Sequence, residues 1–303
     1  MKKVFYFTVC SWLFITTISF SKANETDEII YTRAFADSDY GHYHVAVLQA
    51  ALNATSEFGT TSIAPHPHPM SQSRQLVSLI NGDADIMWSV TNLTREQKLI
   101  PIKLPLLKGY AGHRVLVVSP ARQPDFHHQL DINKLKSMTL VQGVDWPDLE
   151  ILEHNGFTVS GEDWSLWFQS MYSMVEKNLV DGFPRNVIEV HRDLARHSDK
   201  VIALEKNHIL QYPSYEYFFV SPQNAALANR LRVGLIRLLE NGELSALFEA
   251  QEGHKEAASI VESPSRTTHA LKNPSIPYTL DYAQWDKHAS SAIKALLKET
   301  NSN

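Results

Sequence analysis

The stretch NGDADIMWSVT, residues 81–91, decides the fold. It follows SQSRQLVSLI (71–80), in which apolar residues recur at helical spacing. Asn81-Gly82 is a typical end for that helix, because both residues tolerate the left-handed backbone conformation of a helix stop. Residues 85–88 then have the composition of a short buried strand. A helix that leads into a parallel strand delivers the next residues to the edge of an α/β sheet, where ligands bind.

The elements before this stretch continue the same alternation. Residues 28–35 and 60–64 are predicted to be strands, and residues 43–56 a helix. The order strand, helix, strand, helix, strand forms a parallel sheet with helices on its faces. The sequence therefore predicts an α/β fold.

Two apolar strands end in the same tripeptide, Val-Ser-Pro. They are RVLVVSP (114–120) and YEYFFVSP (215–222), and the segment between them has its own alternation of helices and strands. We therefore expect two lobes joined by two hinge crossings. The second lobe (119–212) is expected to be inserted into the first (24–118 plus 213–303).

The two predicted lobes follow a similar plan. In the first, the helix that ends at Asn81-Gly82 is followed by Asp85 and a strand. In the second, an amphipathic helix ends near Asn178 and is followed by Asp181 and a strand. As a repeat this signal is weak, but it favours two lobes of like architecture.

The chain changes character at Gly253. Residues 224–242 carry a stripe of leucines that predicts a long helix, and a short helix is expected at 243–251. From Gly253 onward the sequence is polar and interrupted by prolines. We interpret it as an extended tail over the first lobe, with one late helix around 289–298.

The N-terminus has the pattern of a secretory signal peptide. Two lysines precede an apolar run at 4–20, and Ser21-Lys22-Ala23 offers a small-x-small cleavage pattern. We expect residues 1–23 to be removed and the protein to reach the periplasm through the Sec pathway. The alternative is an uncleaved anchor, since the apolar run is almost long enough to span a bilayer.

Composition excludes several classes of function. Removal of Lys2, Lys3 and Lys22 leaves 25 basic residues (28 minus 3) against 33 acidic ones, a net charge of −8 with His neutral. That balance argues against a nucleic-acid partner, which requires a basic face. The only cysteine, Cys10, lies in the signal segment, so the mature chain is expected to have no disulfide and no thiolate metal site.

Ten residues near the ends of predicted strands are candidate ligand contacts. Arg95 lies in a polar turn after the first-lobe strand, and its guanidinium suits a carboxylate. Arg185 ends the matching strand of the second lobe; if both arginines face the cleft, the ligand is an anion. The alternatives are a solvated Arg95 and an ion pair of Arg185 with Glu189 or another acid. The other candidates are Trp88 for stacking, Ser89 and Thr91 as hydroxyl donors, Asp39 and Tyr40 after the first strand, and Gln142, Asp145 and Trp146 in a second-lobe loop.

Metal binding and catalysis have little support in the sequence. His42-x-His44 and His66-Pro-His68 are alternate pairs that, with His113, have zinc-ligand chemistry, but no HExxH-type helix accompanies them. We interpret these histidines as surface or hinge residues and expect no cofactor. A nucleophile elbow and a P-loop are both lacking.

The chain resembles the periplasmic solute-binding proteins of the type II fold, in the family 3 or polar amino-acid branch. The resemblance covers residues 29–250 and rests on NGDADIMWSVT, TNLTREQ, GYAGHRVLVVSP and YPSYEYFFVSP in this order. It implies two lobes that close on a small ligand, often for delivery to an ABC importer. Some branches of the family are sensor modules and a few are enzymes.

Three departures from the family pattern affect the ligand. In amino-acid binders of this family a Glu-Arg pair follows the turn, and its arginine holds the ligand carboxylate; here Thr94 stands before Arg95. The Gly-x-Thr loop of the second lobe is replaced by the sequence at 142–146. Asp181 lies near the position of the acid that fixes the ligand amine, but Gly-Phe-Pro-Arg follows it. The resemblance therefore supports the fold of the family more strongly than it supports the family's specificity for amino acids.

The sequence as a whole predicts an exported, monomeric binding protein for a small anionic or zwitterionic solute. The ligand is expected to bridge Arg95 and Thr91 on one lobe to Arg185 or the 142–146 loop on the other. The expected partner is an ABC permease. The alternatives are a sensor role, in which the closed form binds a membrane receptor kinase or cyclase, and a periplasmic hydrolase or dehydratase on the same fold.

Overall fold

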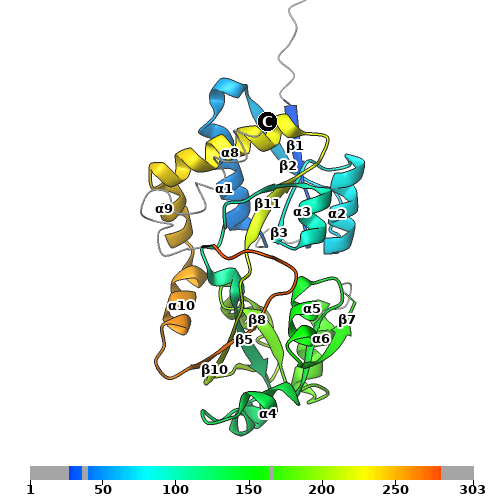
Figure 1. Ribbon diagram of the computed structural model, residues 1–303, viewed down its shortest axis with the longest axis vertical. Helices are drawn as coiled ribbons and strands as arrows, with labels where there is room; N and C mark the ends of the chain where they lie inside the picture. Colours follow the sequence, from blue (N-terminus) through cyan, green and yellow to red (C-terminus); the bar gives the residue numbers. More distant parts are fainter. Residues whose placement is uncertain (1–26, 36–39, 164–166, 281–303) are drawn as a thin grey trace, which may run out of the picture.

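The computed structural model describes residues 27–35, 40–163 and 167–280. The predicted signal peptide, Asp39 and the predicted late helix at 289–298 lie outside these ranges. The described chain forms two α/β bodies stacked along the long axis of the molecule (Figure 1). Within the described ranges, no helix combines the length and the apolar character needed to cross a membrane.

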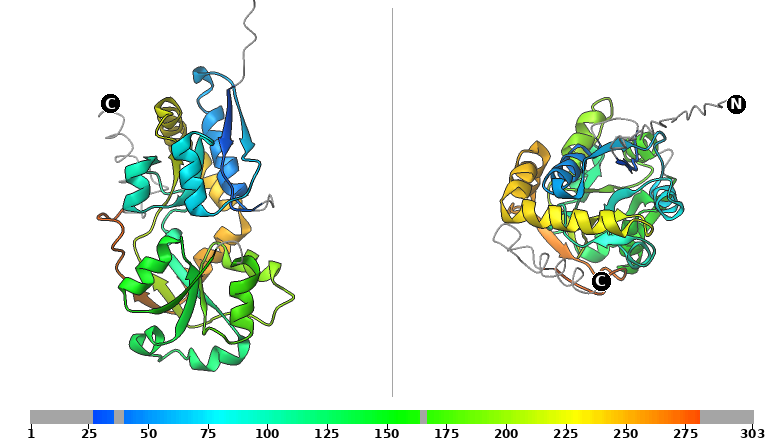
Figure 2. Two further views of the ribbon diagram at one scale, coloured as in Figure 1. Left: turned by 90° about the vertical axis from the view of Figure 1, so that its right-hand side faces the viewer. Right: turned by 90° about the horizontal axis from the view of Figure 1, so that it is seen from above.

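The first body is built on a five-stranded sheet with the order β2-β1-β3-β11-β4. β1 is parallel to β2 and β3, and β11 runs antiparallel to β3 and β4. The strands are β1 (Asp27–Tyr31), β2 (Thr61–Pro65), β3 (Ile86–Val90), β4 (Ile100–Ile102) and β11 (Glu216–Val220). The helices are α1 (His42–Asn53), α2 (Gln72–Asn81), α3 (Leu93–Lys98), α8 (Ala225–Glu240) and α9 (Glu243–Glu249), with a 3₁₀ turn η1 (Ser56–Phe58). Seen from above, α8 lies across the top of this body (Figure 2).

The stretch that decides the fold behaves as predicted. α2 ends at Asn81, and Gly82 adopts a φ of 80°, the left-handed conformation that glycine favours. β3 begins at Ile86, and its apolar residues Ile86 and Met87 are fully buried. The strand therefore carries the residues after it to the edge of the sheet that faces the second body.

The second body contains two connected sheets. One has the order β12-β10-β5-β8, with β9 also paired to β5, and the other consists of β6 and β7. Val141 on β6 donates its N–H to Gly182, just before β8, which joins the two. The strands are β5 (His113–Val118), β6 (Thr139–Gly143), β7 (Thr158–Glu162), β8 (Phe183–Asn186), β9 (Ala203–Leu204), β10 (His208–Gln211) and β12 (Thr267–Ala270). The helices are α4 (Ile132–Lys136), α5 (Pro147–His154), α6 (Trp167–Glu176), α7 (Val190–Arg196) and α10 (Glu252–Val261), with 3₁₀ turns η2 (Tyr110–Gly112) and η3 (Pro120–Asp125).

The first crossing between the bodies lies earlier than the Val-Ser-Pro motif suggested. β5 pairs antiparallel with β8 and β10, so residues 113–118 belong to the second body although we assigned them to the first lobe. The chain crosses at Gly112, whose carbonyl accepts a 3.0 Å hydrogen bond from the N–H of Tyr212 on the returning crossing. A Cβ at position 112 would lie 2.1 Å from the Tyr212 carbonyl oxygen, so only glycine fits here.

The C-terminal segment also differs from the prediction. β12 pairs with β10 in the second body, and α10 packs against α7 of the same body. The segment then returns to the first body, where the Leu280 N–H donates to the Tyr215 hydroxyl at 2.7 Å. In Figures 1 and 2 this orange-to-red segment lies alongside both bodies rather than over the first alone.

The two bodies share one local arrangement, which explains why an aspartate precedes a strand in both halves of the sequence. In the first, Asp85 accepts a hydrogen bond from the Ile30 N–H at 2.9 Å and donates its own N–H to the Ile30 carbonyl at 2.8 Å. In the second, Asp181 makes the same pair of bonds to Thr139, each at 2.7 Å. Each aspartate thus fixes the strand it precedes to the neighbouring parallel strand.

Candidate ligand-binding cleft

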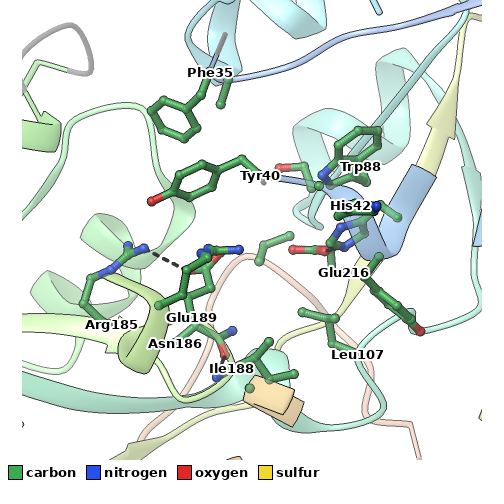
Figure 3. A pocket seen from close by; sticks show the side chains of 18 of the residues that line it. Phe35, Tyr40, His42, Trp88, Leu107, Arg185, Asn186, Ile188, Glu189 and Glu216 are labelled. Carbon is green, nitrogen blue, oxygen red and sulfur yellow. Dashed lines mark hydrogen bonds and ion pairs between the residues drawn. The ribbon is translucent and has the colours of Figure 1, made fainter. Parts of the chain in front are cut away.

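A cavity of about 660 Å³ lies between the two bodies (Figure 3). Its first wall comes from the segments after β1 and at the end of β3, together with the first turn of α1. Its second wall comes from β8, the start of α7 and the start of α5. Strand ends therefore meet the cavity from both sides, which is the usual position of a ligand site in open α/β sheets.

The first wall combines an aromatic surface with an acid. The imidazole of His44 stacks on the indole of Trp88, with ring centroids 5.1 Å apart and an angle of 3° between the planes. His44 also contacts the carboxylate of Glu216 through Nε2. Sequence reasoning considered His44 only as half of a metal pair and missed Glu216. The available signal was the glutamate itself, which opens an otherwise apolar strand.

The second wall holds two buried arginines that are already paired with acids. Arg185 donates through Nε to the fully buried Asp193 at 2.7 Å and forms an ion pair with Glu189 at 2.9 Å. Arg114 is bonded in the same way to Asp148, through Nε and Nη2, each at 2.7 Å. Figure 3 shows Arg185 and Glu189 together on one side of the cavity and Trp88 and Glu216 on the other.

The partners of Arg185 and Asp193 shift the pKa values of both residues. Burial alone would lower the pKa of Arg185, but Asp193, Tyr172 and Glu189 raise it well above its usual value. Burial would raise the pKa of Asp193, but the guanidiniums of Arg185 and Arg192 lower it by more, so its carboxylate stays ionised. The charge of Arg185 is therefore largely neutralised before any ligand enters.

Tyr40 and Ser73 of the first body each contact the second body directly. The Tyr40 hydroxyl, from the first body, donates to Asp193 at 3.1 Å, and the Arg192 guanidinium lies 4.1 Å from the centre of the Tyr40 ring. The N–H of Ser73, in the first turn of α2, donates to Asp145 of the second body at 3.1 Å. The described arrangement is thus one in which the two bodies touch.

Six of the ten predicted site residues line the cavity. They are Tyr40, Trp88, Ser89, Gln142, Trp146 and Arg185. Asp145 does not line it, because its carboxylate is bonded to Ser73. Thr91 does not line it either, because its side chain is fully buried and its hydroxyl donates to Glu96 at 2.7 Å. Thr91 is therefore unsuited to the bridging role predicted for it.

Arg95 lies directly behind the cavity wall. Its side chain is 5% exposed and points away from solvent, which rules out the solvated alternative. Its Nη2 donates to the Gln72 Oε1 at 2.6 Å, and its Nη1 donates to the Val90 carbonyl. Gln72 lines the cavity, whereas Arg95 does not. Burial lowers the pKa of Arg95 to about 10, although distant acids, Asp145 first among them, oppose the shift.

The structure does not bring the two histidine pairs together with His113 as one set of metal ligands. His42 and His44 lie on the cavity wall, whereas His113 is bonded through Nδ1 to the Gly109 carbonyl at 3.1 Å. His66 contacts the His68 backbone. In the described part of the chain, no group of three or more His, Cys, Asp or Glu side chains is arranged to hold a metal ion.

Comparisons with known proteins give structural matches only. No protein-family model and no curated protein sequence matches this chain. An ancestral arginine-binding protein bound to glutamine matches with a TM-score of 0.56 and 13% identity, over 75% of this chain and 98% of its own. A probable amino-acid ABC transporter extracellular-binding protein from Bacillus subtilis matches with a TM-score of 0.55 and 18% identity, over 76% and 99%. A histidine kinase sensor domain with similarity to periplasmic binding proteins matches with a TM-score of 0.54 and 12% identity, over 76% and 96%.

These matches confirm the resemblance in fold that the sequence indicated. Identities below one fifth carry no information on the ligand, so the similarity is one of architecture. Each neighbour is matched over almost its whole length, while about a quarter of this chain extends beyond the shared part. The chain has the α/β fold of the type II periplasmic binding proteins, as found in family 3 solute-binding proteins.

Proposed function

We propose that this chain is an exported periplasmic protein that closes over a small zwitterionic, amino-acid-like solute. The observation that carries the proposal is the cavity of about 660 Å³ with one wall on each body. Cavities of roughly 300–1,000 Å³ are typical of small-molecule sites. A solute that touches both walls binds the closed arrangement better than an open one, so it shifts the hinge equilibrium toward closure.

The charges around the cavity favour a zwitterion over a simple anion. Arg185, which would have formed one half of a site for an anion, is already paired with two acids. Glu216 lines the cavity with its carboxylate on His44, whose imidazole stacks on Trp88. An acid next to an aromatic surface suits an ammonium or guanidinium group. We assign the solute's carboxylate to Ser89, which lines the cavity, and to Arg95, which lies directly behind the cavity wall.

An ABC permease is the proposed partner, and delivery of the solute is the proposed purpose. A second candidate is a ligand-dependent signalling role, which the match to a histidine kinase sensor domain favours. Crosslinking in the native membrane separates the two. A solute-dependent complex with a permease supports import, and one with a receptor kinase or cyclase supports signalling.

The test of solute binding begins with the protein purified from its native compartment. Mass spectrometry of the released small molecules is expected to find an amino-acid-like compound. Calorimetry should then show one-to-one binding without turnover. Glu216→Gln should weaken binding, whereas Glu57→Gln, an acid on the exposed η1 turn paired with Arg237, should not. Absence of binding across the common L-amino acids and their decarboxylated and amidated relatives, or catalytic turnover of the bound compound, would overturn the proposal.

A further inference from the structure

Arg95 differs from the other buried arginines of the cleft. Arg95, Arg114 and Arg185 are each 5% exposed. Arg114 and Arg185 are bonded to buried aspartates, whereas Arg95, among the described residues, is bonded only to neutral oxygens. A guanidinium buried without an acid bonded to it is costly, and that cost falls when an anion binds it. The lowered pKa of Arg95 has the same physical origin.

Gln72 occupies the place where such an anion would bind. It is the first residue of α2 and lies on the cavity wall, between the open cavity and the guanidinium. Its Oε1 accepts from Arg95 at 2.6 Å and from the Ser89 hydroxyl at 3.3 Å. Because a guanidinium only donates hydrogen bonds, the atom facing Arg95 has to be the amide oxygen. One neutral oxygen thus meets two donors that a carboxylate could satisfy together.

We propose that Gln72 is a displaceable occupant of a carboxylate site, and that an entering solute carboxylate replaces its amide oxygen on Arg95 and Ser89. This inference rests on the proposed function and specifies how its anionic end is recognised. Hydrogen bonds between ionised partners are about twice as strong as those between neutral ones. A carboxylate can therefore displace Gln72, whereas a carboxamide only exchanges one amide oxygen for another. Gln72 acts as a filter that rejects neutral analogues.

The filter has a thermodynamic signature that needs no knowledge of the solute. When the amide is removed, an anion no longer competes with it, so Gln72→Ala should bind simple carboxylates more tightly. In Gln72→Glu the new carboxylate should itself bind Arg95 and Ser89. This variant should therefore be more stable toward unfolding than the parent and should no longer bind simple carboxylates. Gln251→Ala is the matched control, because Gln251 lines the same cavity without a contact to Arg95.

The experiment measures melting temperature against sodium acetate, with acetamide as the neutral probe and sodium chloride holding the ionic strength constant. We expect Gln72→Ala to bind acetate roughly fivefold more tightly than the parent and the Gln251→Ala control, from the removal of one competing hydrogen bond. Acetamide should have no effect on the parent or on Gln251→Ala, and in Gln72→Ala, where it can replace the lost amide oxygen, its effect should be smaller than that of acetate. Gln72→Glu should melt at a higher temperature and show at least a tenfold weaker response to acetate.

Two results would overturn the filter. One is an equal acetate response in Gln72→Ala and Gln251→Ala, and the other is a lower melting temperature for Gln72→Glu than for the parent. The proposed function is tested separately, by the calorimetric titrations with amino acids. If Gln72→Ala gains acetate binding but no amino acid binds, the filter stands and the solute assignment fails. If amino acids bind the parent, Gln72→Ala and Gln72→Glu equally, solute binding stands and the filter fails.

Discussion

The loss of Asp193 should destabilise the second body strongly. It is fully buried and accepts hydrogen bonds from Arg185 at 2.7 Å, from Tyr172 at 2.8 Å and, across the cleft, from Tyr40 at 3.1 Å. Asp193→Asn removes the negative charge but keeps the shape. It leaves the buried Arg185 with an ion pair to Glu189, whose side chain is partly exposed.

The expected cost is about 3–5 kcal/mol, the usual result of removing one member of a buried ion pair. Urea denaturation followed by tryptophan fluorescence at pH 7 measures it. Asp199→Asn is the control, because the Asp199 side chain is 72% exposed and its salt bridge within the described ranges is with the neighbouring Lys200, at 3.5 Å. A surface pair of this kind contributes less than about 1 kcal/mol. Equal stability losses in the two variants would refute the reasoning.

The same network has a pH signature with a definite sign. The pKa of Asp193 is lower in the folded protein than the ordinary aspartate value of about 4. Its stabilisation is therefore complete above pH of about 4 and disappears as the pH falls through the lower, folded value. Asp193→Asn should flatten this acid limb of the stability profile. If the parent and the variant lose stability in parallel below pH 4, the stabilising role of the ionised carboxylate is wrong.

Three further predictions concern the hinge, the repeated aspartates and a buried histidine. Gly112→Ala should cost about 1–3 kcal/mol in a thermal melt, because its Cβ would overlap the Tyr212 carbonyl; an unchanged melting temperature would contradict the hinge geometry. Asp85→Ala and Asp181→Ala should each cost about 1–3 kcal/mol in urea denaturation, and the double variant should show the sum to within about 0.5 kcal/mol, since the two lie in separate bodies. Burial lowers the pKa of His254 to about 4, so the parent should lose stability as pH falls from about 6.5 toward 4 while the unfolded chain takes up the proton. Burial also lowers the pKa of His113, His197, His208 and His269, so His254→Gln should reduce that slope without abolishing it; an identical slope in both proteins would contradict the contribution of His254.

Local signals in the sequence were sufficient for the elements around the opening stretch. The helix stop at Asn81-Gly82 depends on backbone conformation, which belongs to the residues themselves, and the structure has α2 ending there. The two Val-Ser-Pro strands are present as β5 and β11. The body to which each strand belongs could not be predicted from local signals, because strand pairing joins residues far apart in sequence. Residues 113–118 pair with β8 and β10, and nothing in their own sequence indicates which sheet they enter.

The cleft could be predicted only in outline. Trp88 and Ser89 line it because the end of β3 faces the second body, which the order of elements implied. Thr91, two residues further on, is buried because its hydroxyl bonds to Glu96, and the direction of a side chain after a strand depends on such packing. The contact between His44 and Glu216 joins residues 172 positions apart, so spacing gave no indication of it.

The C-terminal segment adds connections between the two bodies that affect how they can close on a solute. Within the described chain, the two bodies are connected after β4, after β10, after α9 and again after β12, where two crossings were predicted. Ser275 belongs to the last of these connections and is bonded to both bodies at once. Its carbonyl accepts from the Leu93 N–H of α3 at 3.0 Å, and its hydroxyl donates to Glu150 of α5 at 2.9 Å. A hinge motion that separates α3 from α5 has to break one of these bonds, each worth about 1 kcal/mol. The segment therefore favours the closed arrangement even without solute, and a solute that binds this arrangement has less reorganisation to drive.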